Sequence, residues 1–537
     1  MIFLVLGPIL VGLFFYICHC KFLMKATLIL EAVLIGIALN FLMSSAESSV
    51  QLLSGIAFPM GMKLRVDTLS ATMLVLNNFL FGFMILFNMH KSYMNKLFIF
   101  LFLGLQGLIN GVFLSTDFFN VYILIEVATV VVSILIMYKK DSQSMYDGMI
   151  YLMVNMIAMT FFLLGIGYLY KYTGALDFDN VAVSVETITS KKNLIMPFAL
   201  MITGISLKAA LLPLFSWLPK AHGTASAPSI VSGVLSGIFV KIGIYLFIRV
   251  YFIFGNIFIL SNFFVGIGFL TAIAGFMFAL AQTDIKLILA YHSISQIGLM
   301  MIGLSSAQTA SYYGGLYHIV AHGIFKTLLF LIAGLLIETY HTRDIRKMND
   351  LFRRSKFLSV ILIIAVLSIT GAPFFSGAYS KYYIMKGFSG IGFELLFILI
   401  NMGTMMSFIK FWHVLFKDDQ PFFAPMPSPI GKKILPYNSV IALSLMALSC
   451  ILLGVAGDYM FKLLTTFDAH YGFLSQLVKW PKYLLTYAGS YLAYQAFVKK
   501  NPFFATVKKM ELSFNQITLA ILSFFIVTTL YLHFITA

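Results

Sequence analysis

Apolar runs of membrane-spanning length follow one another along most of this chain, with short polar or charged stretches between them. A helix that crosses a bilayer needs about twenty predominantly apolar residues. Runs near this length predict about sixteen helices, and the run at 480–498 is the weakest of them. They lie at 1–18, 22–43, 70–89, 95–114, 117–138, 147–170, 194–217, 228–252, 258–281, 285–305, 310–338, 356–386, 392–416, 437–458, 480–498 and 514–535. The pattern therefore predicts an all-α polytopic membrane protein.

Composition excludes a soluble globular protein. The chain has 537 residues, of which 60% are hydrophobic and 10% charged, and its mean hydropathy is +0.95. Soluble domains typically have about 45–50% apolar and about 25% charged residues. The N-terminal run lacks a cleavage signature such as Ala-x-Ala, so we expect a retained first span.

The net charge of +16 is explained by topology. Basic residues concentrate in the loops after odd-numbered predicted helices, whereas the loops after helices 4, 8 and 10 have almost none. By the positive-inside rule the odd loops are cytoplasmic, the highly charged 341–356 linker among them, and both termini lie outside. No basic-aromatic pattern indicates nucleic acid. The residues counted are Lys139, Lys140, Arg343, Arg346, Lys347, Arg353, Arg354, Lys356, Lys432, Lys433, Lys499, Lys500, Lys508 and Lys509.

The sequence predicts no cofactor and no metal. Cys18, Cys20 and Cys450 are the only cysteines and form no Cys-x-x-Cys pair, which argues against an iron–sulfur or zinc site. No nucleotide or flavin motif is present either. We therefore expect any redox chemistry to belong to partner subunits.

Two apolar runs are interrupted beside a lysine. The stretch 207–228 contains Lys208 and Pro213, and the stretch 368–381 contains Pro373 and ends at Lys381. A proline removes a helical hydrogen bond, and a lysine at membrane depth is costly and usually marks an ion path. Paired interrupted helices in two halves indicate a transporter site. The alternative is an ordinary proline kink with a lysine that reaches the membrane surface.

Two further ionisable groups lie within apolar helices. Glu126 is about two turns into the helix at 117–138, where Thr116 or Asp117 is the expected cap. A carboxylate at this depth needs a cationic partner, and Lys208 and Lys241 are the candidates. Small residues before Lys241 favour close helix packing, so this lysine is expected inside the bundle, as a relay group or a structurally paired one.

Histidines and a lysine recur in the helices at 285–305 and 310–338. His318, His322 and Lys326 follow at intervals of four and therefore share one helical face, and His292 lies on the preceding helix. Histidine can exchange a proton near neutral pH, so these residues suit a proton relay. Structural hydrogen bonding is the alternative. A metal pair is disfavoured because Ile319 replaces the glutamate that zincin chemistry requires.

Three other polar residues lie in or beside the apolar runs. Asp67 is the expected cap of the helix at 70–89. Glu31 could belong to a proton path, but contact with a neighbouring hydroxyl is favoured. Lys410 lies near a cytoplasmic helix end, where it could be a relay group or reach the membrane surface.

The order of these residues predicts an internal repeat. Five helices separate each residue of the first set from its counterpart in the second, and an odd-numbered repeat is inverted in the membrane. The expected units are 1–94 (helices 1–3), 95–254 (helices 4–8), 255–417 (helices 9–13) and 418–537 (helices 14–16). The two sets are Glu126, Lys208 and Lys241, then His292, Lys381 and Lys410.

Several segments together resemble a known family, the antiporter-like subunits shared by respiratory complex I, membrane-bound hydrogenases and Mrp-type cation/proton antiporters. The resemblance covers roughly residues 60–415 and is nearer to the Mrp D or hydrogenase type. The segments are DFFNVYILIE, SLKAALLPLFSWLPKAHGTASAPS, SGIFVKIGIYLFIR, DIKLILAYHSISQIG, LYHIVAHGIFKTLLFLIAG, RDIRKMNDLFRR and GAPFFSGAYSK.

The resemblance implies a fourteen-helix core with inverted repeats and broken helices 7 and 12, followed here by about two extra C-terminal helices. It implies that Glu126 and Lys208 form an ion pair at a channel entrance, that Lys241 and His318 are central relay positions, and that Lys381 is the terminal residue. His292 and His322 fall in channel-lining motifs. Lys220 departs from the family, which usually has an acidic residue there. No long amphipathic lateral helix is apparent, which argues against the largest complex I chain.

We therefore expect a proton-translocating subunit, or a sodium/proton-exchanging one, of a multisubunit assembly in a bacterial or archaeal energy-coupling membrane. The expected partners are other integral membrane subunits of an antiporter, hydrogenase, quinone reductase or carbon-uptake complex. Two alternatives stay open. A secondary transporter of an organic or inorganic ion predicts a roomy pocket at the bilayer midplane, and a non-conducting anchor would not need this many lysines and histidines at membrane depth.

Overall fold

The computed structural model describes residues 1–537 except 19–22, 45–48, 53–62, 417–434, 500 and 537. Cys20 and three of the lysines used for topology, Lys432, Lys433 and Lys500, lie outside the described residues. Each of the predicted apolar runs coincides with helix. In the described part of the chain, 12 helices are long and apolar enough to cross a membrane, and two shorter apolar helices accompany them. The prediction of an all-α polytopic protein is confirmed.

The N-terminal part consists of three helices and a hairpin that the sequence analysis missed. The Asp67 side chain accepts a hydrogen bond from the Ser70 N–H at 2.9 Å, so the predicted cap of α3 is confirmed. The hairpin strands are antiparallel, with Ser49 opposite Val66 and Leu52 opposite Lys63. The elements are α1 (Ile2–Ile17), α2 (Leu23–Ser44), β1 (Ser49–Leu52), β2 (Lys63–Val66) and α3 (Thr68–Asn88).

The next part of the chain contains the first interrupted helix. Asp117 caps α5 by accepting from the Asn120 N–H at 2.7 Å. Helix α8 ends at Lys208, and helix resumes at Trp217. The elements are α4 (Lys96–Leu114), α5 (Phe118–Ile136), η1 (Met137–Lys139), α6 (Ser142–Thr173), α7 (Phe178–Thr187), η2 (Lys191–Leu194), α8 (Ile195–Lys208), α9 (Trp217–His222), α10 (Ser229–Val234), the π-helical turn η3 (Leu235–Phe239) and α11 (Val240–Phe254).

Protein groups satisfy the backbone at this first interruption. The Trp217 indole N–H donates to the Leu207 carbonyl at 2.8 Å, and the Leu212 N–H donates to the Thr271 hydroxyl at 3.0 Å. Irregular backbone at membrane depth is tolerated only where such partners or a wet cavity are available. The irregular segment between α8 and α9 contains Pro213. It begins directly after Lys208, several residues before the proline.

The following part contains the second interrupted helix. Helix α16 ends at Thr370, and Gly371 follows with φ +81°, a left-handed conformation that glycine adopts without a steric penalty. Helix resumes at Ser376. The elements are α12 (Ser261–Ala281), α13 (Ile285–Leu304), α14 (Thr309–Tyr340), η4 (Ile345–Lys347), α15 (Leu351–Arg354), α16 (Lys356–Thr370), α17 (Ser376–Lys386) and α18 (Ile391–Leu415).

Two pairs of aspartates form equivalent backbone bridges, one in the part of the chain with the first interrupted helix and one in the part with the second. Asp117 pairs with Asp177 in an isolated antiparallel bridge, and Asp284 pairs with Asp344 in another. Each aspartate of the second pair follows its counterpart by the same number of residues, and all four side chains cap the helix that they precede. These bridges are consistent with the predicted repeat of helices 4–8 and 9–13. The inverted repeat and its domain boundaries stay predictions.

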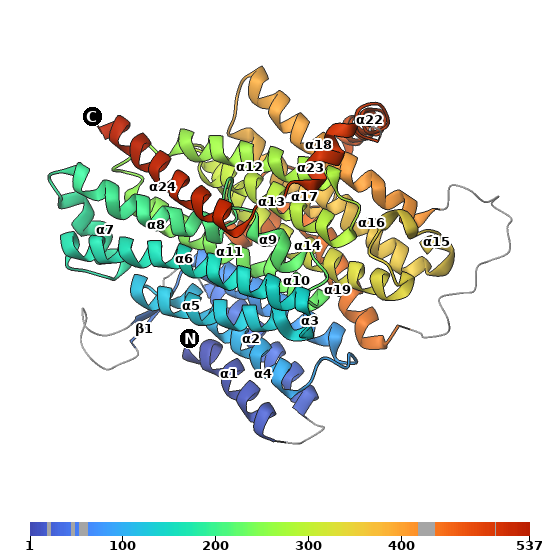
Figure 1. Cartoon of the computed structure of the whole chain (residues 1–537), viewed down its shortest axis with the longest axis horizontal. Helices are drawn as coiled ribbons and strands as arrows, with labels where there is room; N and C mark the ends of the chain where they lie inside the picture. Colours follow the sequence, from blue (N-terminus) through green and yellow to red (C-terminus); the bar gives the residue numbers. More distant parts are fainter. Residues whose placement is uncertain (19–22, 45–48, 53–62, 417–434, 500, 537) are drawn as a thin grey trace.

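The C-terminal part departs from the simple series of spans. Figure 1 shows α22 nearly end-on while the long helices around it lie closer to the plane of the picture, so α22 crosses them steeply. It has 14 residues and is not among the helices that could span a membrane by length and composition. The elements are α19 (Tyr437–Val455), α20 (Gly457–Thr465), α21 (Phe473–Val478), α22 (Trp480–Ala493), the π-helical turn η5 (Tyr494–Val498), α23 (Pro502–Lys509) and α24 (Phe514–Thr536).

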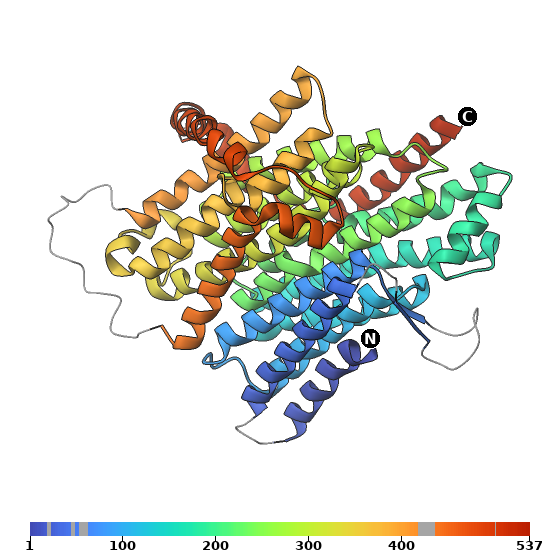
Figure 2. The ribbon, with the colours of Figure 1, turned by 180° about the vertical axis from the view of Figure 1, so that it is seen from behind.

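The centre of the bundle is formed by α14 and by the continuous segment of α10, η3 and α11. In both, the most apolar window of residues is completely buried. The N-terminal helices α1 and α2 lie along one edge (Figures 1 and 2). Ionisable residues on the central helices are therefore shielded from lipid by other helices.

Candidate functional site: buried lysines and histidines

Lys208 occupies the first helix break and is hydrogen bonded to neutral groups. Its ammonium donates to the Thr129 hydroxyl of α5 at 2.7 Å and to the Asn155 side-chain oxygen of α6 at 3.1 Å. It also lies 4.9 Å from the centre of the Phe239 ring, a distance at which a cation is attracted to an aromatic face. The side chain is only 1% exposed.

The predicted direct ion pair between Glu126 and Lys208 is not present. Among the described residues, no ion pair within 4.0 Å joins them, although their charges lie close enough to interact. The physical reason is the position of Thr129, whose hydroxyl lies about one turn further along α5 and takes the ammonium. One carboxylate oxygen of Glu126 is buried and has no hydrogen-bond partner in the described ranges of the chain. The two charged groups are therefore neighbours that lack direct contact.

Lys241 and His322 form the central contact of the site. The Lys241 ammonium and His322 Nδ1 lie 2.7 Å apart, which joins α11 to α14. The ammonium also donates to the Ser236 carbonyl. Ser236 belongs to the π-helical turn just before Lys241, and such turns occur frequently at functional sites in helices. Lys241, as predicted, lies inside the bundle.

His318 connects this contact to the second helix break. Its Nδ1 is hydrogen bonded to the Ser380 hydroxyl of α17 at 2.8 Å, and its Nε2 lies 3.2 Å from the Gln296 side-chain oxygen of α13. The rings of His318 and His322 are 6.2 Å apart between centres. Lys381 directly follows Ser380 on α17, so His318 contacts the helix that carries Lys381.

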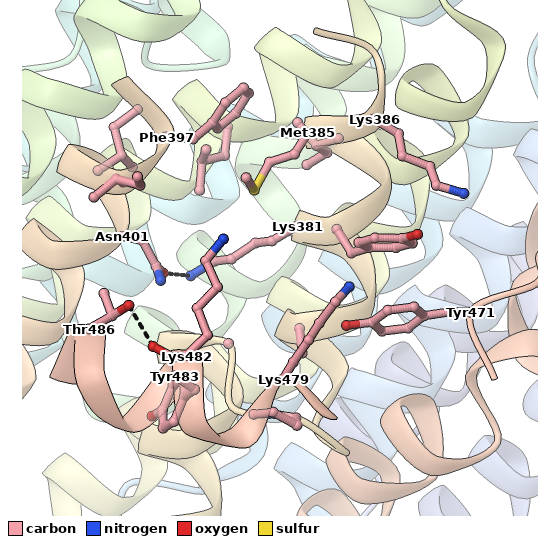
Figure 3. A pocket seen from close by; sticks show the side chains of 18 residues that line it. Lys381, Met385, Lys386, Phe397, Asn401, Tyr471, Lys479, Lys482, Tyr483 and Thr486 are labelled. Carbon is pink, nitrogen blue, oxygen red and sulfur yellow. Dashed lines mark hydrogen bonds between the residues drawn. The ribbon is translucent and has the colours of Figure 1, made fainter. Parts of the chain in front are cut away.

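Lys381 borders a cavity of about 400 Å³ at the second break. Its ammonium donates to the Ile369 carbonyl, at the end of α16, at 2.8 Å and to the Asn401 side-chain oxygen of α18 at 3.1 Å. Figure 3 shows Lys381 and Asn401 joined by this hydrogen bond within the cavity. Lys381 therefore has space beside it.

Lys326 and His292 lie deep in the bundle without forming a chain with the others. The Lys326 ammonium donates to the Leu289 carbonyl of α13 at 2.6 Å. Neither ring nitrogen of His292 has a hydrogen-bond partner in the described part of the chain, and its ring lies 4.9 Å from that of Phe408. His318, His322 and Lys326 share one helix, but His322 contacts α11, whereas His318 contacts α13 and α17 and Lys326 contacts α13.

Three other predicted residues have structural contacts. Lys410 is buried, and its ammonium donates to three carbonyls at the end of α12, the Leu280 carbonyl among them at 2.6 Å. Glu31 accepts from the Gln106 amide at 2.8 Å rather than from a hydroxyl. Lys220 donates to the Leu512 carbonyl at 2.8 Å.

Several further buried polar residues near these lysines and histidines were not predicted from the sequence. Lys286 is buried and donates to the Ala227 carbonyl at 2.8 Å. His222 is buried, and neither of its ring nitrogens has a hydrogen-bond partner among the residues that the structure describes. Lys286 belongs to the DIKL motif and His222 to the PKAHG motif, so both were visible as ionisable residues in apolar surroundings. Thr129 and Asn155 had no such signal, because neutral polar residues are common in helices.

The geometry defines a polytopic membrane protein that carries ionisable groups at membrane depth, beside two interrupted helices. Such groups are rare within membrane helices and typically mark an ion or proton path.

Comparison with known proteins assigns the family. The family described as NADH:quinone oxidoreductase/Mrp antiporter, TM, matches residues 115–407, more than half of the chain. This chain belongs to that family. It is 28% identical over 418 residues to the D-type component of the Na(+)/H(+) antiporter of Alkalihalophilus pseudofirmus, a match that covers 75% of this chain and 82% of that protein.

Two solved structures share the fold. One is a chain of the membrane-bound sulfane sulfur reductase, an archaeal respiratory membrane complex, with a TM-score of 0.77 and 23% identity over 90% of this chain and 99% of that chain. The other belongs to the Mrp complex from Dietzia sp. DQ12-45-1b, with a TM-score of 0.77 and 20% identity over 89% of this chain and 98% of that chain. The predicted resemblance to antiporter-like subunits is confirmed.

Proposed function

We propose that this chain is an ion-translocating, antiporter-like subunit of a multisubunit membrane assembly, and that it moves protons along its buried lysines and histidines. The family assignment and the relative named as a component of a Na(+)/H(+) antiporter support the class of function. Both solved structures belong to multisubunit complexes by name, which supports other membrane subunits as partners. The residue roles rest on the geometry alone.

The observation that carries the proposal is the contact between Lys241 and His322 at 2.7 Å. A basic nitrogen beside an ammonium can accept its proton without either group leaving the interior. His318 is on the same helix and is bonded to Ser380, which precedes Lys381. The proposed order is Glu126 and Lys208, then Lys241, His322, His318 and Lys381, with bound water in the longer gaps.

Charge repulsion explains how a proton could be driven along this row of residues, from Glu126 and Lys208 to Lys381. The buried ionisable groups between the two breaks are mostly bases, and like charges in a low-dielectric interior destabilise one another. A proton added at one end therefore makes the next protonated group less stable. Glu126, the acidic group near Lys208, favours charge at that end. A change in the distance between Glu126 and Lys208 would thus push a proton inward.

The test is ion flux in vesicles that contain the whole assembly, with Lys241→Met compared with Lys410→Met. Both variants remove one buried ammonium, but only Lys241 lies in the proposed row. We expect Lys241→Met to reduce proton flux by at least about a hundredfold, in line with the loss of one acid–base group, and Lys410→Met to retain flux within about twofold. Assembly is checked by co-purification. A parallel measurement of sodium flux shows whether the assembly exchanges sodium for protons or moves protons alone.

One observation favours a second candidate, a permease for an organic ion, because the cavity beside Lys381 has about 400 Å³, within the range of small-molecule sites. A permease would not depend on the contact between Lys241 and His322. Normal proton flux in Lys241→Met would therefore argue for the permease or for a non-conducting anchor.

A further inference from the structure

The cavity beside Lys381 is lined by lysines and tyrosines and contains no acidic side chain among its described lining residues. The charged residues that border it are Lys381 and Lys386 of α17, Lys479 just before α22, and Lys482 on α22. Figure 3 shows the α22 side of the cavity facing Lys381 and Asn401. Four cations around one space of about 400 Å³ create a strongly positive potential there.

Two of these lysines, Lys479 and Lys386, lie against aromatic rings. The Lys479 ammonium lies 3.6 Å from the centre of the Tyr382 ring and 4.1 Å from that of Tyr471. The Lys386 ammonium lies 4.9 Å from the centre of the Tyr382 ring. Rings position the ammonium groups without neutralising their charge. Among the residues that the structure describes, no carboxylate lies within ion-pair distance of Lys479, Lys482 or Lys386.

The lysines also repel one another. Partial burial, together with the charges of Lys482 and Lys386, lowers the pKa of Lys479 to about 8. A bound anion would remove this repulsion, because it would interact favourably with several ammonium groups at once. The cavity is thus built for negative charge.

The surroundings of the cavity are apolar and exposed. Met385 and Ile398 line it and are 38% and 39% exposed. On the flanking helices, Leu395 of α18 and Leu485 of α22 are 59% and 75% exposed. In a membrane protein such leucines face acyl chains. An anion with an apolar tail could therefore place its charge in the cavity and its tail along these leucines.

We propose that the cavity binds the phosphate of an anionic membrane phospholipid, with the headgroup among Lys381, Lys479 and Lys482 and the acyl chains along Leu395 and Leu485. The headgroup would neutralise the cationic end of the row, and the lipid would fasten α22 across the second break. Both consequences are independent of which ion is translocated.

The test uses the full-length chain reconstituted in vesicles, with tryptophan quenching by brominated phosphatidylglycerol compared with brominated phosphatidylcholine at equal mole fraction. Trp480 directly follows Lys479, so a lipid in the cavity lies near an intrinsic reporter. The pocket variant is Lys479→Gln with Lys482→Gln. The matched control is Lys191→Gln with Lys192→Gln, which removes two exposed lysines elsewhere.

We expect stronger quenching by the anionic lipid in the unchanged chain and in the control. The pocket variant should bind the anionic lipid about thirtyfold more weakly, since each lysine near a lipid headgroup contributes by about fivefold. Unaltered helix content by circular dichroism shows that the variant folds. Equal quenching by the two lipids in the unchanged chain would overturn the proposal.

Two further arms separate the sources of the anion. Added inorganic phosphate should not abolish the preference for phosphatidylglycerol, and its abolition would indicate a soluble anion instead. The preference should also persist in the purified assembly. Its loss there would indicate that an acidic segment of a partner subunit occupies the cavity, which would likewise overturn the lipid assignment.

Discussion

The two helix breaks hold a lysine in similar ways but in different surroundings. Lys208 and Lys381 each donate to one asparagine oxygen, from Asn155 and Asn401 respectively, and to one further oxygen. Lys208 is sealed among side chains and has Glu126 nearby. Lys381 borders a cavity whose described lining residues include no acidic side chain. The difference indicates that charge at the first break is controlled by a residue of this chain, and at the second by what enters the cavity.

The largest expected effect is at the first break. Lys208→Arg should reduce proton flux by at least about a hundredfold while the assembly stays intact, because guanidinium does not deprotonate in proteins. Lys208→Ala should be as severe or worse. Glu126→Gln should also block flux, since the amide keeps the shape and loses the charge. Vesicle flux with parallel purification is the measurement. Normal flux in both Lys208→Arg and Glu126→Gln would remove the first break from the mechanism.

Chemical rescue should distinguish a closed site from an open one. Lys381→Ala should reduce flux by about tenfold or more, and added methylammonium should restore part of it, because the cavity leaves room for a small amine. Lys208→Ala should not respond, since its site is sealed. Flux is measured at increasing methylammonium concentration. Rescue of both variants, or of neither, would contradict the proposed contrast.

Substitution of the asparagine at each break should show the same contrast between a closed and an open site, with smaller losses of flux. Asn155→Ala leaves Lys208 with one hydrogen-bond acceptor in a buried site, and a hydrogen bond to a charged group is worth about 1.5–3 kcal/mol. We expect flux to fall by about tenfold. Asn401→Ala should cost about threefold or less, because water can enter the cavity and replace the amide. Equal losses would mean that the two sites are equally closed.

The smallest effect is expected from single cysteine substitutions, which test the side of the membrane that each loop faces. In a chain with its native cysteines replaced by serine, Lys347→Cys should react only with reagents on the cytoplasmic side and Lys192→Cys only with those outside. Both lysines are exposed, so neither change should alter flux. Labelling of Lys347→Cys from outside would show that the charge asymmetry was misinterpreted and that the termini do not lie outside.

The helices and most of their caps were predictable because they depend on local sequence. The apolar runs predicted the helices, and Asp67 was identified as a cap from its position before a run, whereas the next cap was left between Thr116 and Asp117 and the structure assigns it to Asp117. The hairpin at β1 and β2 was missed because its strands have only four residues each. The crossing of α22 was missed because an apolar helix of this composition is interpreted as a span whatever its direction.

The ionisable residues of the site were predictable, but their partners were not. Lysines and histidines within apolar runs stand out in any sequence, and Lys208, Lys241 and His318 were found in this way. The partner of Lys208 was predicted to be Glu126, since opposite charges attract. The structure instead places Thr129 and Asn155 against it, and only the packing of α5 and α6 decides between a charged and a neutral acceptor.

The contacts of the buried lysines also set an order for membrane insertion. The chain is made from its N-terminus, and a lysine at the centre of an inserting helix costs about 2.5–3.5 kcal/mol. When Lys208 enters the bilayer, Thr129 and Asn155 have already been synthesised. Lys241 enters before His322 exists, and until α14 arrives it has only the Ser236 carbonyl of its own segment. The newly made chain is therefore most exposed to misassembly between the synthesis of α11 and that of α14.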